Sequence, residues 1–96
     1  MHVISKSALR AFWEKHADAR APLETWFSIV EKASWRNFAE VRGTFNSADV
    51  AGIYTILKIK GNAYRVVTAI HYNRQKVYIR HVFTHPEYDR WNKEGK

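Results

Sequence analysis

The chain has 96 residues, 46% of them hydrophobic, which excludes a disordered tail and predicts one folded domain over residues 1–96. Without cysteine it has no disulfide or thiolate metal site, and without a run of ~20 apolar residues it has no membrane span, so we expect a soluble protein of the cytoplasm. The net charge of +7 comes almost entirely from residues 51–96, which contain nine basic and three acidic side chains. We therefore expect a polyanionic partner: nucleic acid first, then an anionic membrane or an acidic protein.

Helical spacing dominates the N-terminal part of the chain. After an apolar opening at Val3 and Ile4, Ser5 can cap a helix whose apolar stripe consists of Leu9, Phe12, Trp13 and His16. Pro22 suits the first turn of a second helix, whose stripe consists of Leu23, Trp26, Phe27 and Val30. We expect these two helices to form a hairpin that turns both stripes into the core.

A third, shorter helix is predicted next, followed by a connection. Ser34 can cap this helix, which runs through Phe38 and Val41 and ends where Gly43 accepts a left-handed conformation. Residues 44–52 contain turn residues without a sustained period, so they are interpreted as a connection.

Beyond this connection the apolar residues recur at every second position, as in a strand. Residues 53–60, 63–72 and 76–84 are rich in β-branched and aromatic side chains, and Gly61-Asn62 and Asn73-Arg74-Gln75 suit the turns between them. This pattern predicts an antiparallel meander, which Val3 and Ile4 can extend as a fourth strand. The expected fold is α+β, with two N-terminal helices and a short third packed on an antiparallel sheet of three to four strands.

Alternation along these strands gathers cations on one face of the sheet. The apolar face of the third strand consists of Val77, Ile79, His81 and Phe83, and we expect it to face the helices. The other face of the sheet then collects Lys58, Lys60, Arg65, Tyr78 and Arg80. Neighbouring cations repel one another, so they indicate an anionic partner, although an ordinary solvated face is the alternative. RNA is favoured over duplex DNA because unpaired bases can stack on Tyr72, Tyr78, Tyr88 and Trp91.

RNA can be cleaved without a metal when its 2′-hydroxyl attacks the adjacent phosphate, provided that the site supplies a base, an acid and cations. The five histidines match no familiar zinc spacing, so neither a metal nor a cofactor is expected. His85 is the best titrating candidate, Tyr88 or a lysine can share the proton transfers, and Arg65 and Arg80 can hold a phosphate through two hydrogen bonds each. The alternative is that the segment from His85 to Tyr88 only caps a C-terminal helical turn.

The segments KGNAYRVVTAIHY and VYIRHVFTHPEYD, together with the MHVISKSAL start and the FAEVRGTFNSADVAG linker, resemble the HigB family of toxins within the RelE-like group. The resemblance implies the RelE-like fold and the toxin of a type II toxin-antitoxin pair. Such a toxin cleaves messenger RNA, generally on the translating ribosome. The implied partner is a helix-turn-helix antitoxin of the HigA type, and operator DNA is reached only through the complex with that antitoxin.

The family's motif falls on Lys60, Asn62, Arg65, Tyr78, Arg80, His85, Glu87 and Tyr88. The resemblance implies that Tyr88 or His85 transfers protons and that Arg65, Arg80 and Lys60 stabilise the phosphate, whereas Asn62 and Glu87 are structural. The predicted RNA-binding set is Lys58, Lys60, Arg65, Arg74, Lys76, Tyr78 and Arg80. The competing function is a noncatalytic module in which the same cations bind RNA, the ribosome or the antitoxin.

Overall fold

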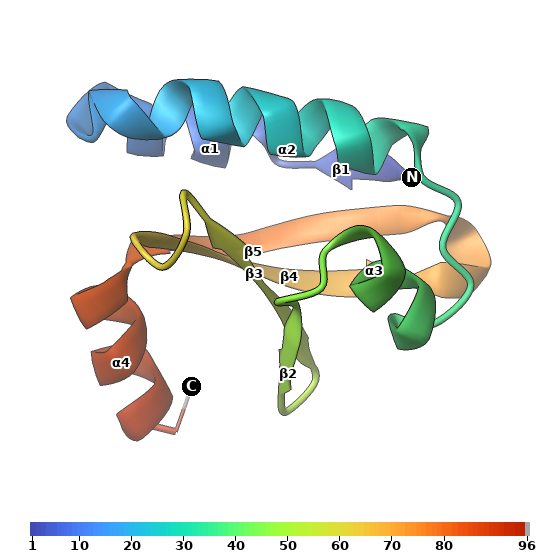
Figure 1. Cartoon of the computed structure of the whole chain (residues 1–96). Helices are drawn as coiled ribbons and strands as arrows, with labels where there is room; N and C mark the ends of the chain where they lie inside the picture. The colour runs from blue at the N-terminus through green and yellow to red at the C-terminus, as the bar shows by residue number, and fades with distance from the viewer. Residues whose placement is uncertain (96) are drawn as a thin grey trace.

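The computed structural model describes residues 1–95, which form an α+β fold of four α-helices and one five-stranded sheet. The strands are β1 (His2–Ile4), β2 (Asp49–Ala51), β3 (Tyr54–Ile59), β4 (Tyr64–His71) and β5 (Lys76–Thr84). The helices are α1 (Lys6–Lys15), α2 (Arg20–Lys32), α3 (Phe38–Thr44) and α4 (His85–Lys93). Figure 1 shows α1 and α2 side by side across one face of the sheet, while α4 lies on the opposite side of the sheet.

The sheet confirms the predicted meander and extends it. Its five strands lie in the order β1-β5-β4-β3-β2. β3, β4 and β5 pair antiparallel as expected, but β1 joins β5 in parallel, so the sheet is mixed. The interpretation of residues 44–52 as a connection was wrong in part, because β2 lies within it and pairs with β3. A strand of three residues gives too few alternating positions for a period to be read.

Two of the predicted helix caps were also wrong. Ser5 precedes α1 with a φ of 78°, and its side chain makes no capping hydrogen bond. The cap of α3 is Asn37 in place of Ser34, since the Asn37 side chain accepts a hydrogen bond from the backbone N–H of Glu40. Gly43 lies inside α3 and does not end it.

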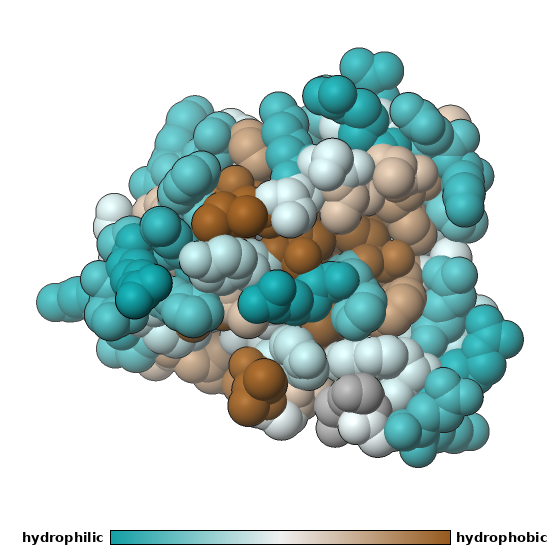
Figure 2. Space-filling view, turned by 180° about the vertical axis from the view of Figure 1, so that it is seen from behind, coloured by the Kyte–Doolittle hydropathy of each residue, from teal (hydrophilic) through white to brown (hydrophobic). Residues whose placement is uncertain are grey.

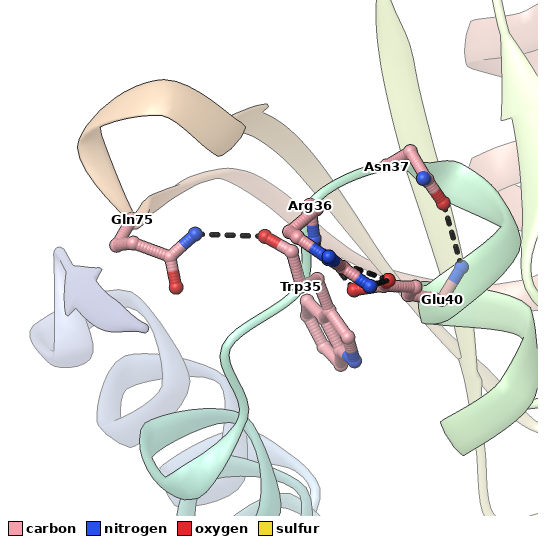
Figure 3. Close-up of polar contacts among 5 residues, drawn as sticks. All are labelled: Trp35, Arg36, Asn37, Glu40 and Gln75. Carbon is pink, nitrogen blue, oxygen red and sulfur yellow. Dashed lines mark hydrogen bonds and ion pairs between the residues drawn. The ribbon is translucent and has the colours of Figure 1, made fainter.

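Long-range contacts explain why α3 begins three residues later than expected. Figure 3 shows the Gln75 side-chain amide donating to the carbonyl oxygen of Trp35, at 2.7 Å, which ties the stretch between α2 and α3 to the turn between β4 and β5. The indole of Trp35 is buried and donates to the Thr44 hydroxyl at 3.0 Å. Arg36 pairs with Glu40 at 2.8 Å. These contacts hold the chain extended up to Asn37, where a helix can start.

A bulge in β5 changes which side chains face the helices. Thr68 of β4 lies opposite Ile79, but the preceding Val67 lies opposite His81, so Arg80 is an extra residue without a partner. The alternation of β5 is therefore inverted after Ile79. Val82 packs against the core beneath the helices, whereas His81 and Phe83, which were expected there, lie on the other face under α4.

The main core lies between the α1/α2 layer and the sheet. Its fully buried side chains include Leu9, Leu23 and Val30 from the helices and Leu57, Val66 and Val77 from the strands. The predicted helical stripes are therefore confirmed as core positions except at His16, which is only partly buried. Among residues 1–95, no helix has the length and apolar character needed to cross a membrane.

Candidate active site

The start of α4 places Tyr88 against Arg65 and ties the backbone of His85 to the turn between β3 and β4. The backbone N–H of His85 donates to the carbonyl oxygen of Ala63 in that turn, at 3.1 Å. The guanidinium carbon of Arg65 lies 5.6 Å from the centroid of the Tyr88 ring. We refer to Arg65, His85 and Tyr88 as the α4 site.

The segment that carries His85 and Tyr88 is held by a capping box. The Thr84 hydroxyl accepts from the backbone N–H of Glu87, and the Glu87 carboxylate accepts from the backbone N–H of Thr84, at 2.8 Å. Pro86 adds a fixed φ in the first turn. The N-cap is thus Thr84. The segment from His85 begins a helix of nine residues, which is longer than the single helical turn considered as the alternative.

Arg65 is a fixed cation at the base of this site. Only 5% of the residue is exposed, so the prediction that it lies on an open basic surface was wrong. Its guanidinium donates to the carbonyl oxygen of Asn62 at 2.8 Å and weakly to the Asn62 side-chain oxygen at 3.4 Å. It sits on β4 opposite Lys58 on one side and Phe83 on the other. A buried guanidinium held in this way keeps its charge and its direction.

His85 has an acidic partner one helical turn along α4. Its Nδ1 atom lies 3.0 Å from a carboxylate oxygen of Asp89, and about half of each side chain is exposed. A carboxylate on Nδ1 orients the ring and leaves Nε2 to exchange a proton with a substrate.

Tyr88 is half-buried, and its ring packs against the Arg65 guanidinium. Burial raises the pKa of its phenol above the usual 10, and Asp49 and Asp89 add to the rise while Arg65 opposes it. The phenol is therefore protonated at neutral pH, where it can donate a proton but cannot serve as a base.

An aromatic cluster fixes α4 to the sheet next to the α4 site. The Trp91 ring centroid lies 5.5 Å from Tyr54, 5.4 Å from His81, 5.7 Å from Phe83 and 5.9 Å from Tyr88. The sequence analysis missed His81 and Phe83 as neighbours of this site because the bulge in β5 is not visible in the alternation. Burial and the charge of Arg80 lower the pKa of His81.

Lys60 occupies the β3–β4 turn but points to the layer of α1 and α2. Its ammonium nitrogen lies 2.5 Å from a carboxylate oxygen of Asp18, in the connection between these helices, and the Tyr64 hydroxyl donates to the other oxygen at 2.6 Å. Hydrogen bonds from Lys60 and then Tyr64 lower the pKa of Asp18. Lys60 is thus engaged beside the α4 site and is not directed into it.

The remaining predicted residues lie farther along the sheet. Tyr78 packs edge-on against His71, with ring centroids 4.9 Å apart, and the Arg80 guanidinium lies 5.3 Å from the Tyr78 ring. Arg74 and Lys76 belong to the turn between β4 and β5. That turn is at the opposite end of β5 from α4, roughly 25 Å away at ~3.3 Å per residue. The seven residues of the predicted RNA-binding set therefore do not form one patch.

The described part of the chain, residues 1–95, has no group of three or more His, Asp and Glu side chains placed to hold a metal ion. The α4 site offers a fixed cation, an imidazole backed by a carboxylate, and a protonated phenol. These groups can stabilise an anionic phosphate and move protons to and from its oxygens.

Comparison with known proteins gives consistent matches over nearly the whole chain. Residues 19–91 match a family model described as HigB_toxin, RelE-like toxic component of a toxin-antitoxin system. A protein of Escherichia coli K12 named mRNA interferase toxin HigB is 30% identical over 92 residues, which cover 93% of this chain and 88% of that protein. The mRNA interferase HigB of Shigella flexneri matches to the same extent. That of Escherichia coli O6:H1 is 24% identical over 102 residues, covering 100% of this chain and 99% of the relative.

Proposed function

The chain belongs to the HigB family of RelE-like toxins of toxin-antitoxin systems, and on that basis we propose that it is an endoribonuclease that cleaves messenger RNA on the translating ribosome. We propose further that a helix-turn-helix antitoxin of the HigA type neutralises it. The relatives are named mRNA interferases, which supports an RNA-cleaving enzyme. The observation that carries the proposal is the contact of Arg65 with Tyr88 at the start of α4, the helix that also carries His85.

The chemistry that suits this site is attack by the RNA 2′-hydroxyl on its own phosphate. His85, with Asp89 behind it, takes the proton from the 2′-hydroxyl. Negative charge develops on the phosphate oxygens, and Arg65 offers a fixed positive charge for them. Tyr88 donates its proton to the departing 5′-oxygen, so one P–O bond forms, one breaks, and the products are a 2′,3′-cyclic phosphate and a 5′-hydroxyl. No metal takes part in these steps.

One observation favours the noncatalytic alternative. Because Arg65 is only 5% exposed and holds the Asn62 carbonyl, it can act as a structural anchor for the turn without touching RNA. In that case the chain binds RNA, the ribosome or the antitoxin and cleaves nothing.

A translation reaction programmed with one message separates these functions. The purified protein is added with and without ribosomes, and the new RNA ends are mapped and chemically identified. We expect internal cuts that require ribosomes, end in a 2′,3′-cyclic phosphate, and disappear when the antitoxin is added first. Inhibition of translation with an intact message supports the noncatalytic module, whereas 5′-phosphate ends contradict the metal-independent reaction.

A further inference from the structure

A cleft of about 350 Å³ lies between α1 and the second half of β5 and reaches the first turn of α4. Phe12 and Val82 line its apolar part, and Lys15, Arg80 and Glu87 stand among its polar residues. Figure 2, which views the molecule from behind, shows apolar side chains at the centre of this face with hydrophilic ones around them.

Two features of the sheet create the cleft. β1 pairs only with the first three residues of β5, from Lys76 to Tyr78, so β5 has a free edge from Ile79 onward. At that edge the bulge removes Arg80 from the alternation and places it among the residues that line the cleft. Bulges commonly redirect a side chain beside a functional site.

The cleft has an excess of positive charge. Neither Lys15 nor Arg80 makes an ion pair with an acidic side chain within residues 1–95. Among residues 1–95, Glu87 is the one acid that lines the cleft, and its carboxylate already accepts a hydrogen bond from the backbone N–H of Thr84 in the capping box. Two cations beside an apolar wall fit a phosphate and the nucleoside attached to it.

The cleft is also continuous with the α4 site. Glu87, which lines it, belongs to the first turn of α4 between His85 and Tyr88. A strand whose scissile phosphate lies at the α4 site can therefore pass along the start of α4 and enter the cleft without leaving the protein surface.

We propose that this cleft is a second RNA subsite, which holds a phosphate flanking the scissile one between Lys15 and Arg80, with its nucleoside against Phe12 and Val82. The proposal rests on the proposed function and assigns Arg80 to binding the flanking strand. An acidic protein segment is the competing occupant, and continuity with the α4 site favours RNA.

The test measures binding without cleavage. The probe is a fluorescein-labelled 2′-O-methyl RNA of roughly 10 nucleotides, which lacks the attacking hydroxyl, and its affinity is followed by anisotropy over a range of salt concentrations. Lys15→Glu is compared with Arg10→Glu, which makes the same charge change on the same helix but lines a different groove with Trp13 and Glu14. Lys15→Ala is a milder second variant, and circular dichroism checks that all variants fold.

We expect Lys15→Glu to weaken binding roughly three- to tenfold and Lys15→Ala to lower the slope of log affinity against log salt by about 0.7, the loss of one phosphate contact. Arg10→Glu should change affinity and slope less. Equal effects of Lys15→Glu and Arg10→Glu, or unchanged RNA binding with lost antitoxin binding, overturn the proposal. If the parent binds this probe but cuts no message, the proposed function fails while the subsite stands.

Discussion

The guanidinium of Arg65 packs against the ring of Tyr88 at 5.6 Å, which joins the β3–β4 turn to α4 through a buried cation and a half-buried phenol. Arg65 is held from the other side by the carbonyl oxygen of Asn62, so the position of Tyr88 depends on the conformation of that turn. The first two predictions concern these two side chains.

Tyr88→Phe removes the proposed acid and keeps the ring against Arg65 and Trp91. Because positioned acid–base groups contribute about 10²–10⁴-fold, we expect message cleavage to slow by at least about 100-fold with little change in thermal stability. Tyr78→Phe, on β5 against His71, is the matched control and should retain cleavage. Since the pKa of Tyr88 is raised above 10, the parent's rate should show no titration of Tyr88 across the neutral range.

Arg65→Lys keeps the charge but cannot reproduce the forked guanidinium that reaches the Asn62 carbonyl. Losing a charged hydrogen bond at a buried site should lower the free energy of unfolding by about 1–3 kcal/mol, measured by urea denaturation. Cleavage should fall as well, because the replacement ammonium has no fixed direction toward the phosphate. If the variant is destabilised but cleaves at the parent's rate under native conditions, Arg65 is a structural anchor only.

His85→Gln tests the proposed base. The variant lacks the group that takes the proton from the 2′-hydroxyl, and a positioned base contributes about 10²–10⁴-fold, so message cleavage should slow by at least about 100-fold. Asp89→Asn keeps the imidazole but removes the carboxylate 3.0 Å from its Nδ1, and it should reduce cleavage less than His85→Gln does. Cleavage by His85→Gln at the parent's rate would assign the base to another residue.

Asp18→Asn tests the contact that holds the β3–β4 turn against the helices. The pKa of Asp18 is lowered from 3.8 in the folded state, so its ionised form stabilises the fold above that pH, and the stabilisation is lost as the pH falls through the folded-state value. The parent should therefore be more stable than Asp18→Asn at neutral pH, and the difference should shrink below about pH 3.8. Urea unfolding of both proteins at several pH values measures this, and a difference that does not depend on pH would contradict it.

Much of the fold could be predicted because its signals are local. The helical stripes around Leu9 and Leu23 and the three long strands have enough residues to display a period. The caps of α1 and α3 could not be predicted in the same way, because tertiary contacts such as Gln75 to Trp35 decide where the chain leaves its extended form.

The site could be predicted only in part, because some of its features depend on how distant segments pack together. The motif named Arg65, His85 and Tyr88 as catalytic candidates, and the structure places Arg65 against Tyr88, but the burial of Arg65 depends on where α4 packs. The bulge at Arg80 inverts the faces of β5, and no turn residue marks it. Asp18 pairs with Lys60 across 42 positions of sequence, a contact that only the folded chain creates.

The central claim is that the α4 site cleaves messenger RNA, and the most direct measurement maps RNA ends in cells after induction without antitoxin. The parent is compared with a His85→Gln, Tyr88→Phe double variant produced at the same level. We predict new internal message ends with the parent and none above background with the double variant, while both proteins still bind ribosomes. The same ends at the same abundance in both would contradict the assignment of the α4 site.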